Sequence, residues 1–68
     1  MMFVLATEVP NGAITTFTSG VPWNGFLPTP TINGRTRTEG FTVVDQRTVR
    51  FDEPPRYGDV VGFFVNPK

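Results

Sequence analysis

Glycine and proline interrupt this chain at intervals too short for most α-helices. Seven Gly and seven Pro are spread over 68 residues, and the only stretch of ten or more residues without either is 41–53. Val, Ile, Thr, Phe, Tyr and Trp occupy 30 positions, whereas Leu and Ala together occupy four. β-Branched and aromatic side chains suit a pleated sheet, and frequent turns separate short strands. The sequence therefore predicts an all-β fold, a small antiparallel β-sandwich or partly open barrel of five to seven short strands.

The short length limits how much apolar surface the chain can bury. A domain of this size buries only about 60% of the surface that its unfolded chain exposes. The sequence has no Cys for a disulfide or a thiolate metal site, and it has no His. We therefore expect no cofactor and no metal, and we expect oligomerisation to bury further apolar surface. A symmetric homo-oligomer, possibly a trimer, is the predicted state.

The charge pattern argues against several classes of partner. Six basic and six acidic residues cancel, so no long-range field attracts a phosphate backbone, and we expect no nucleic acid. The longest apolar runs are far shorter than the ~20 residues of a membrane span, and no basic segment resembling a signal peptide begins the chain. Five of the six basic residues are Arg, which is enriched at protein interfaces. We expect the chain to be synthesised in the cytoplasm and to function through protein–protein contacts.

Turn signals divide the chain into short apolar segments. Asn33-Gly34 is the strongest two-residue hairpin signal. Pro28 and Pro30 predict an edge strand or a polyproline-like run, because proline lacks the N–H that a sheet interior needs. We expect residues 1–7 to be an apolar arm or first strand, and residues 8–68 to be a single β-sandwich domain. The predicted strands are 2–6, 14–18, 26–32, 35–38, 41–44, 48–51 and 60–65.

Two of these segments carry clear face patterns. In the hairpin 41–44 and 48–51, Phe41 and Val43 share one face, while Thr42 and Arg50 point outward. The last segment is apolar on both faces, which predicts that both of its faces are covered. Gly62 within it predicts a bulge or a close approach by another part of the chain.

Several short phrases follow one another in a distinctive order. They are Glu8-Val9-Pro10-Asn11-Gly12-Ala13-Ile14, Thr16-Phe17-Thr18, Ile32-Asn33-Gly34-Arg35, Gly40-Phe41-Thr42-Val43, Thr48-Val49-Arg50-Phe51, Pro54-Pro55 and Gly58-Asp59-Val60-Val61.

This order resembles a β-sandwich module of tailed-bacteriophage virion proteins, found in tail fibres, receptor-binding proteins and head decoration proteins. The resemblance extends from Glu8 to about Val65. The sequence departs from the module in two ways. Pro28 and Pro30 interrupt a strand that is normally apolar and alternating, and the match takes up nearly all of the 68 residues, whereas the module is usually one segment of a longer protein. The resemblance implies a structural subunit of a virion surface, such as a capsid decoration (cement) or fibre-base protein. Its implied partners are further copies and other virion proteins, such as capsid or tail subunits.

Apolar and arginine side chains are the candidates for contact with partners. The apolar N-terminus either forms the first strand or docks on a neighbouring subunit, and docking is slightly favoured because the module begins near Glu8. Arg35 and Arg37 share one face of a short strand, where they either meet acidic groups of a neighbour or remain in water. The candidate residues for partner binding are Met2, Phe3, Leu5, Trp23, Phe26, Arg35, Arg37, Phe63 and Phe64.

A second functional class is a receptor- or carbohydrate-binding module of a phage tail. An exposed Trp23 beside Asn24, together with Arg35, would stack on and hydrogen-bond a host-surface glycan. The more ordinary expectation is that Trp23 caps the core or meets another protein, since tryptophan prefers largely buried sites.

The acidic residues do not form a recognisable catalytic set. Four of the six lie in expected turns, where carboxylates are common. Asp52, Glu53 and Asp59 do not form the dense oxygen-ligand loop of a calcium site. We therefore expect no enzyme activity and no catalytic residues.

Overall fold

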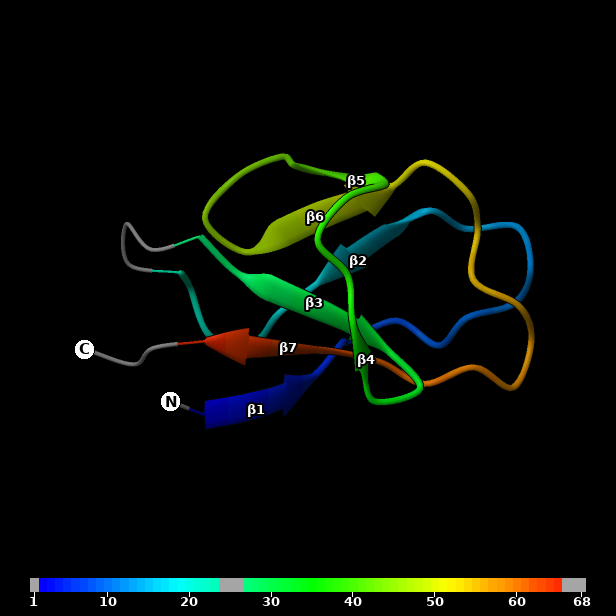
Figure 1. The fold of residues 1–68 in the computed structure, drawn as a ribbon, viewed down its shortest axis with the longest axis horizontal. Helices are drawn as coiled ribbons and strands as arrows, with labels where there is room; N and C mark the ends of the chain where they lie inside the picture. The colour runs from blue at the N-terminus through cyan, green and yellow to red at the C-terminus, as the bar shows by residue number, and fades with distance from the viewer. Residues whose placement is uncertain (1, 24–26, 66–68) are drawn as a thin grey trace.

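The computed structural model describes residues 2–23 and 27–65, which form two antiparallel sheets packed face to face (Figure 1). The described residues contain seven strands and no helix, so the predicted all-β fold is confirmed. The first sheet has the order β1 (Met2–Leu5), β7 (Val61–Val65), β3 (Thr29–Ile32), β4 (Arg35–Thr36), and the second has the order β2 (Thr16–Thr18), β6 (Thr48–Phe51), β5 (Phe41–Val43).

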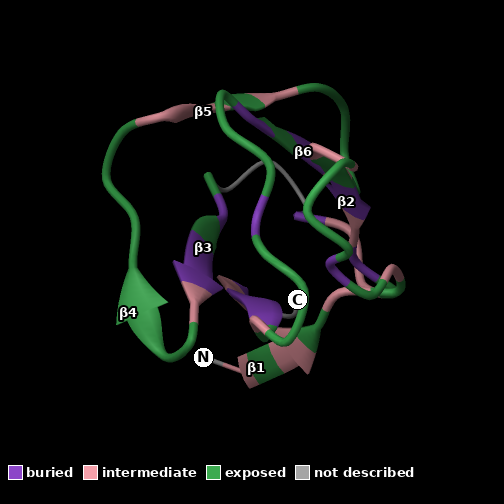
Figure 2. Cartoon of the chain, turned by 90° about the vertical axis from the view of Figure 1, so that its right-hand side faces the viewer, coloured by how far each residue is buried: buried purple, intermediate pink, exposed green. Residues whose placement is uncertain are grey.

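The core lies between the two sheets. Phe17, Val49 and Phe51 reach it from the second sheet, and Val61, Phe63 and Val65 reach it from the first. The Phe17 and Phe51 rings meet edge to face with their centroids 5.7 Å apart, a favourable aromatic geometry. Figure 2 shows the buried residues concentrated on β3, β7, β6 and β2, whereas β4 is exposed throughout.

The β5–β6 hairpin follows the predicted alternation. Its register places Phe41 opposite Phe51, Thr42 opposite Arg50 and Val43 opposite Val49. Thr42 and Arg50 are exposed, and the other side chains pack against or within the core. The period-2 pattern predicts the two faces of this hairpin correctly because one face is buried and the other is in water.

The prediction that the proline-containing segment is an edge strand is wrong, because β3 pairs with β7 on one side and with β4 on the other. Asn33 N donates to Val60 O at 2.8 Å, so Thr29 and Thr31 direct their backbone groups toward β7. The nitrogen of Pro30 therefore lies on the β4 side. There β4 pairs only with Thr31 and Ile32, and the Pro30 carbonyl accepts a hydrogen bond from Arg37 N at 2.8 Å. Arg37 thus lies opposite Pro30 and makes one of the two hydrogen bonds of that pair. The ladder ends there, so the missing N–H of proline interrupts no further pairing.

Several predicted strands are longer than those observed. The strand predicted at 14–18 begins at Thr16, because the Asn11 side chain accepts hydrogen bonds from Ala13 N and Ile14 N and holds that segment in a turn. The strands predicted at 26–32, 35–38 and 60–65 also lose one or more residues at their ends. The predicted Asn33-Gly34 turn is confirmed, with φ of 54° and 81° at its two residues.

Candidate protein interface

The first sheet ends in an edge strand whose outer side is open. β1 pairs with β7 alone, and in Figure 1 it forms the lower rim of the sheet. Ala6 N donates to Val61 O at 2.9 Å, so Met2, Val4 and Ala6 direct their backbone groups toward β7. In an antiparallel ladder the alternate residues then direct theirs away from it. The N–H and C=O groups of Phe3 and Leu5 therefore face the open side of the sheet.

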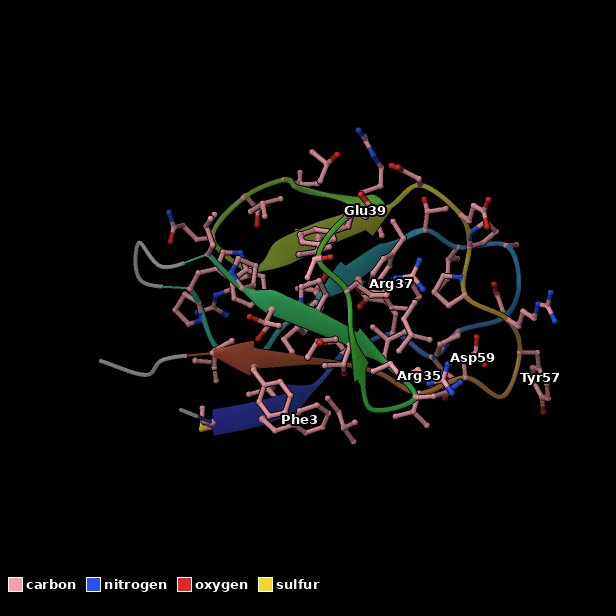
Figure 3. All side chains as sticks on the ribbon, viewed as in Figure 1. Phe3, Arg35, Arg37, Glu39, Tyr57 and Asp59 are labelled. Carbon is pink, nitrogen blue, oxygen red and sulfur yellow. The ribbon has the colours of Figure 1, made fainter. Side chains whose placement is uncertain are left out.

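The side chains of β1 divide between the two faces of the sheet. Met2 and Val4 pack against the core, whereas Phe3 and Leu5 lie on the outer face with 45% and 59% of their surface exposed. The Phe3 ring meets the half-buried Phe64 ring edge to face, with the centroids 5.1 Å apart. Figure 3 shows Phe3 in front of the sheet beside β1. The strand carries no charged side chain, so its open edge is both unpaired and apolar.

Gly62 explains how Phe3 comes to lie there. A Cβ atom at this position would collide with the Phe3 ring and would lie 3.0 Å from the Val4 carbonyl oxygen. The predicted close approach at Gly62 is thus confirmed, and the approaching group is β1 itself. The missing side chain lets the Phe3 ring rest on the backbone of β7, which fixes the edge strand against the sheet.

The corresponding edge of the second sheet is covered. Thr18 in β2 donates its N–H to Glu8 Oε1 at 2.6 Å and its hydroxyl to Glu8 Oε2 at 2.8 Å. Its carbonyl oxygen accepts a hydrogen bond from Thr7 N at 2.8 Å. The segment directly after β1 therefore occupies the outward backbone groups of Thr18, at the C-terminal end of β2. Filling an edge in this way is a common protection against strand pairing between molecules.

The two remaining edges offer less to a partner strand. β4 has only two residues, and the exposed Arg35 and Arg37 lie within it and directly after it. β5 has three residues, and its apolar side chains turn toward the core. Short length and charge both disfavour pairing at a sheet edge. Among the described strands, β1 is thus the longest unprotected edge.

An apolar hollow of about 170 Å³ continues the surface of β1 at its C-terminal end. Its wall is mainly apolar but includes two carboxylates; it is lined by Leu5, Ala6, Glu8, Val9, Pro10, Asp59, Val60 and Val61. Leu5, Val9 and Val60 are each more than half exposed, so this end of the edge presents apolar side chains to solvent.

The structure gathers some of the predicted contact residues and separates others. Met2, Phe3, Leu5 and Phe64 lie together on β1 and β7. Arg35 and Arg37 lie on the opposite border of the sheet, beyond β3. Phe26 and Asn24 lie outside the described residues.

The prediction that Trp23 and Phe63 belong to an interface is wrong, because both side chains are buried in the core of the chain itself. The ordinary expectation that Trp23 lies at the core is confirmed. Trp23 is 3% exposed, and its ring lies 5.2 Å from that of Phe63. Its indole Nε1 donates to the Asp45 carbonyl oxygen at 2.7 Å. The ring therefore has no free face on which a sugar could stack, which removes the main support for the carbohydrate-binding alternative.

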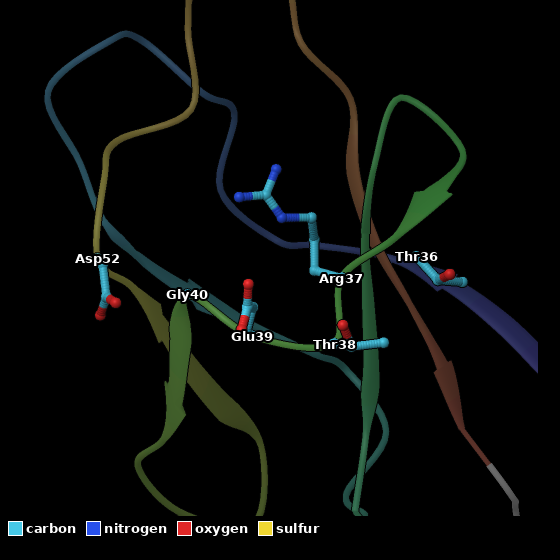
Figure 4. Close-up of a pocket in the computed structure, with 6 residues that line it drawn as sticks. All are labelled: Thr36, Arg37, Thr38, Glu39, Gly40 and Asp52. Carbon is cyan, nitrogen blue, oxygen red and sulfur yellow. The ribbon is translucent and has the colours of Figure 1, made fainter.

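The arginine border of the sheet has an open hollow of mixed charge (Figure 4). The hollow is lined by one guanidinium group and two carboxylates, together with two threonines and a glycine. No group of three or more metal-ligating side chains occurs in the parts of the chain that the structure describes. The hollow is lined by Thr36, Arg37, Thr38, Glu39, Gly40 and Asp52.

Two structural roles were not predicted from the sequence. The sequence places Glu8 in one of the ordered phrases and among the six acidic residues, but its capping of β2 depends on a contact with Thr18, ten residues away. Asn33 was predicted as a turn residue, but its side chain also donates to Asp59 Oδ1 at 3.0 Å and accepts from Val60 N at 2.8 Å. The bond from Asn33 Nδ2, followed by that from Arg56 N, lowers the pKa of Asp59 below its ordinary value.

No helix in the described segments has the length and apolar character needed to cross a bilayer. Comparison of the chain with protein-family models, with curated proteins and with solved structures finds no match.

Proposed function

We propose that this chain is a structural subunit of a bacteriophage virion surface and that it acts through protein–protein contacts at the β1 edge. The observation that supports the proposal is the open, uncharged edge strand with exposed Phe3 and Leu5. Backbone groups at an open edge provide affinity for an added strand, and neighbouring side chains provide specificity. The virion setting comes from the resemblance of the ordered sequence phrases to modules of phage particles.

The rest of the molecule suits a structural role. Its core is filled by aromatic and β-branched side chains of both sheets, with Trp23 fixed by a hydrogen bond at one end. Among the described residues, four of the seven exposed large apolar side chains lie at β1 or the hollow beside it, and the other three, Leu27, Val44 and Tyr57, are exposed elsewhere. A capsid decoration or fibre-base subunit needs such a rigid body with a defined contact edge. Its partners would be further copies of the chain and other capsid or tail proteins.

The proposal is tested by asking whether the chain is part of the particle and whether β1 holds it there. Particles of the phage that encodes the chain are purified, and the chain is quantified by mass spectrometry. Leu5→Lys places a charge on the contact edge, and we expect its incorporation to fall about tenfold, which corresponds to ~1.4 kcal/mol of binding free energy. Val44→Lys is the matched control, since Val44 is 52% exposed and lies beside the β5–β6 turn, away from β1.

The outcomes separate clearly. Wild-type and Val44→Lys chains present in purified particles, with Leu5→Lys depleted, support the proposal. Absence of the wild-type chain from particles contradicts the virion role, and equal incorporation of all three chains contradicts the role of β1.

A further inference from the structure

We propose that β1 pairs with β1 of a second copy of this chain, antiparallel and about a two-fold axis. The two four-stranded sheets then join into one continuous sheet. This inference rests on the proposed function, because it names the first partner of the same edge. It concerns the strand Met2–Leu5, whose outer side pairs with no other described strand.

The backbone restricts the register of such a pair. Among the described residues of β1, only Phe3 and Leu5 direct N–H and C=O groups to the open side, so these two residues face each other across the axis. Placing Phe3 opposite Leu5 of the second copy satisfies both residues in both chains and forms four hydrogen bonds. Placing Leu5 opposite Leu5 would instead bring Phe3 against Thr7, whose N–H already bonds to Thr18 O. Placing Phe3 opposite Phe3 would leave Leu5 without a partner among the described residues, which begin at Met2.

The side chains are complementary in the same register. Phe3 of each copy lies beside Leu5 of the other on the outer face, next to the Phe64 ring. Apolar cross-strand pairs of this kind stabilise antiparallel sheets, and like charges directly opposite each other would destabilise them. β1 contains no charge, so the two-fold axis places no like charges together. The strand is therefore suited to pair with itself.

The symmetry of this contact selects the size of the assembly. Two identical antiparallel strands that pair with each other define a closed, isologous two-fold interface. A three-fold axis cannot place the same strand opposite itself. The edge therefore supports a dimer in place of the trimer suggested by the sequence, and larger assemblies would use a different surface.

Single cysteines test the register directly, because the chain has no native Cys. Val4 lies on the two-fold axis as a non-hydrogen-bonded pair with itself, where Cα atoms are ~4.5 Å apart, within the range of a disulfide. Leu5 faces Phe3, so two Cys residues at position 5 would be separated by roughly 8 Å, which is too far. Under mild oxidation we expect Val4→Cys to give at least about ten times more covalent dimer than Leu5→Cys.

The mass of the native chain provides the second measurement. In sedimentation equilibrium, the wild-type chain should approach twice its 7.6 kDa mass as concentration rises. Leu5→Lys should raise the dimer dissociation constant at least about tenfold, and Val44→Lys should leave it unchanged. Circular dichroism of each variant verifies that the fold is intact.

Each remaining outcome overturns the self-pairing. A wild-type chain that stays monomeric at all concentrations, a trimer mass, or equal cross-linking of Val4→Cys and Leu5→Cys would do so. If the monomeric chain still enters particles in a Leu5-dependent manner, a strand of another particle protein occupies β1 and the proposed function survives. If it enters no particles, the proposed function fails as well.

Discussion

β1 and β2 are consecutive strands, and each lies at the edge of a sheet. They differ in whether the backbone groups on their outer side are hydrogen-bonded within the chain. At β2, the Glu8 carboxylate and Thr7 N occupy the open backbone groups of Thr18. At β1, the corresponding groups of Phe3 and Leu5 face outward beside exposed apolar side chains. A sheet edge left both unpaired and apolar is a template for another strand. The difference shows that the chain covers part of one edge with its own residues and leaves the outer side of β1 open.

The open edge at β1 and the capped edge at β2 are linked by the segment that follows β1. Thr7 and Glu8 come immediately after the strand and its last ladder bond at Ala6. A few residues therefore end one sheet, cross to the other and cap it. A substitution that loosens this segment should lower the stability of the fold at β2, whereas substitutions on the outer side of Phe3 and Leu5 should reduce assembly. Four predictions test this separation.

The largest expected effect on stability is at the covered edge. Glu8→Ala removes the acceptor of two hydrogen bonds to Thr18 and leaves a partly buried N–H without its partner. We expect the free energy of unfolding to fall by about 1–3 kcal/mol. Urea denaturation followed by circular dichroism measures it. Glu53→Ala, at an exposed loop position, is the control and should change it by less than about 0.5 kcal/mol. Equal effects of the two variants would show that the cap contributes nothing.

The next effect concerns the attachment of β1 to its own sheet. Gly62→Ala introduces a Cβ atom where the Phe3 ring lies, so the ring must move and β1 must loosen. We expect a loss of about 1–2 kcal/mol in thermal or urea unfolding. Gly20→Ala, where nothing lies within 4 Å of the added atom, should be close to neutral. Phe3→Ala combined with Gly62→Ala should cost less than the sum of the two single changes. Full additivity would mean that the ring and Gly62 do not interact.

A smaller, pH-dependent effect on the free energy of unfolding is expected at Asp59, which precedes β7. Hydrogen bonds from Asn33 Nδ2 and Arg56 N lower the pKa of Asp59 in the folded state. The ionised carboxylate therefore stabilises the fold at pH values above its ordinary pKa of 3.8, and this contribution is lost as pH falls through the lowered folded pKa. Urea unfolding of wild type and Asp59→Asn between about pH 2 and 7 measures it. The difference between the chains should shrink in acid, and a constant difference would contradict this assignment.

The smallest effect on stability is expected at the open edge. Leu5→Lys replaces a side chain that is 59% exposed, so the unfolding free energy of the isolated chain should change by less than about 0.5 kcal/mol. The same substitution is expected to reduce assembly about tenfold. A urea titration at a concentration where the chain is monomeric checks the first part. A large destabilisation would show that Leu5 supports the fold rather than an interface.

The sequence predicted those elements whose patterns are local. The alternation of the β5–β6 hairpin, the Asn33-Gly34 turn and the close approach at Gly62 depend on neighbouring residues or on backbone freedom, and all three are confirmed. The pairing of β3 on both sides was missed, because it depends on where β4 ends.

The candidate interface was predicted only in part. Met2, Phe3, Leu5 and Trp23 are all large apolar residues, but Trp23 lies in the core and Phe3 at the rim. The preference of tryptophan for buried sites favours the position of Trp23, whereas nothing in the sequence predicts that Phe3 is partly exposed, since only the fold determines which apolar side chains are covered. The cap by Glu8 was likewise invisible, because it joins residues ten positions apart.

Amide hydrogen exchange of Leu5 and Thr18, followed by NMR across a range of chain concentrations, tests the central claim most directly. Thr18 N, bonded to Glu8, should be protected at every concentration. Leu5 N should exchange freely in the dilute chain and become protected as the chain associates. Protection of Leu5 that is already present in the dilute monomer, or that never appears in the associated chain, would contradict the account.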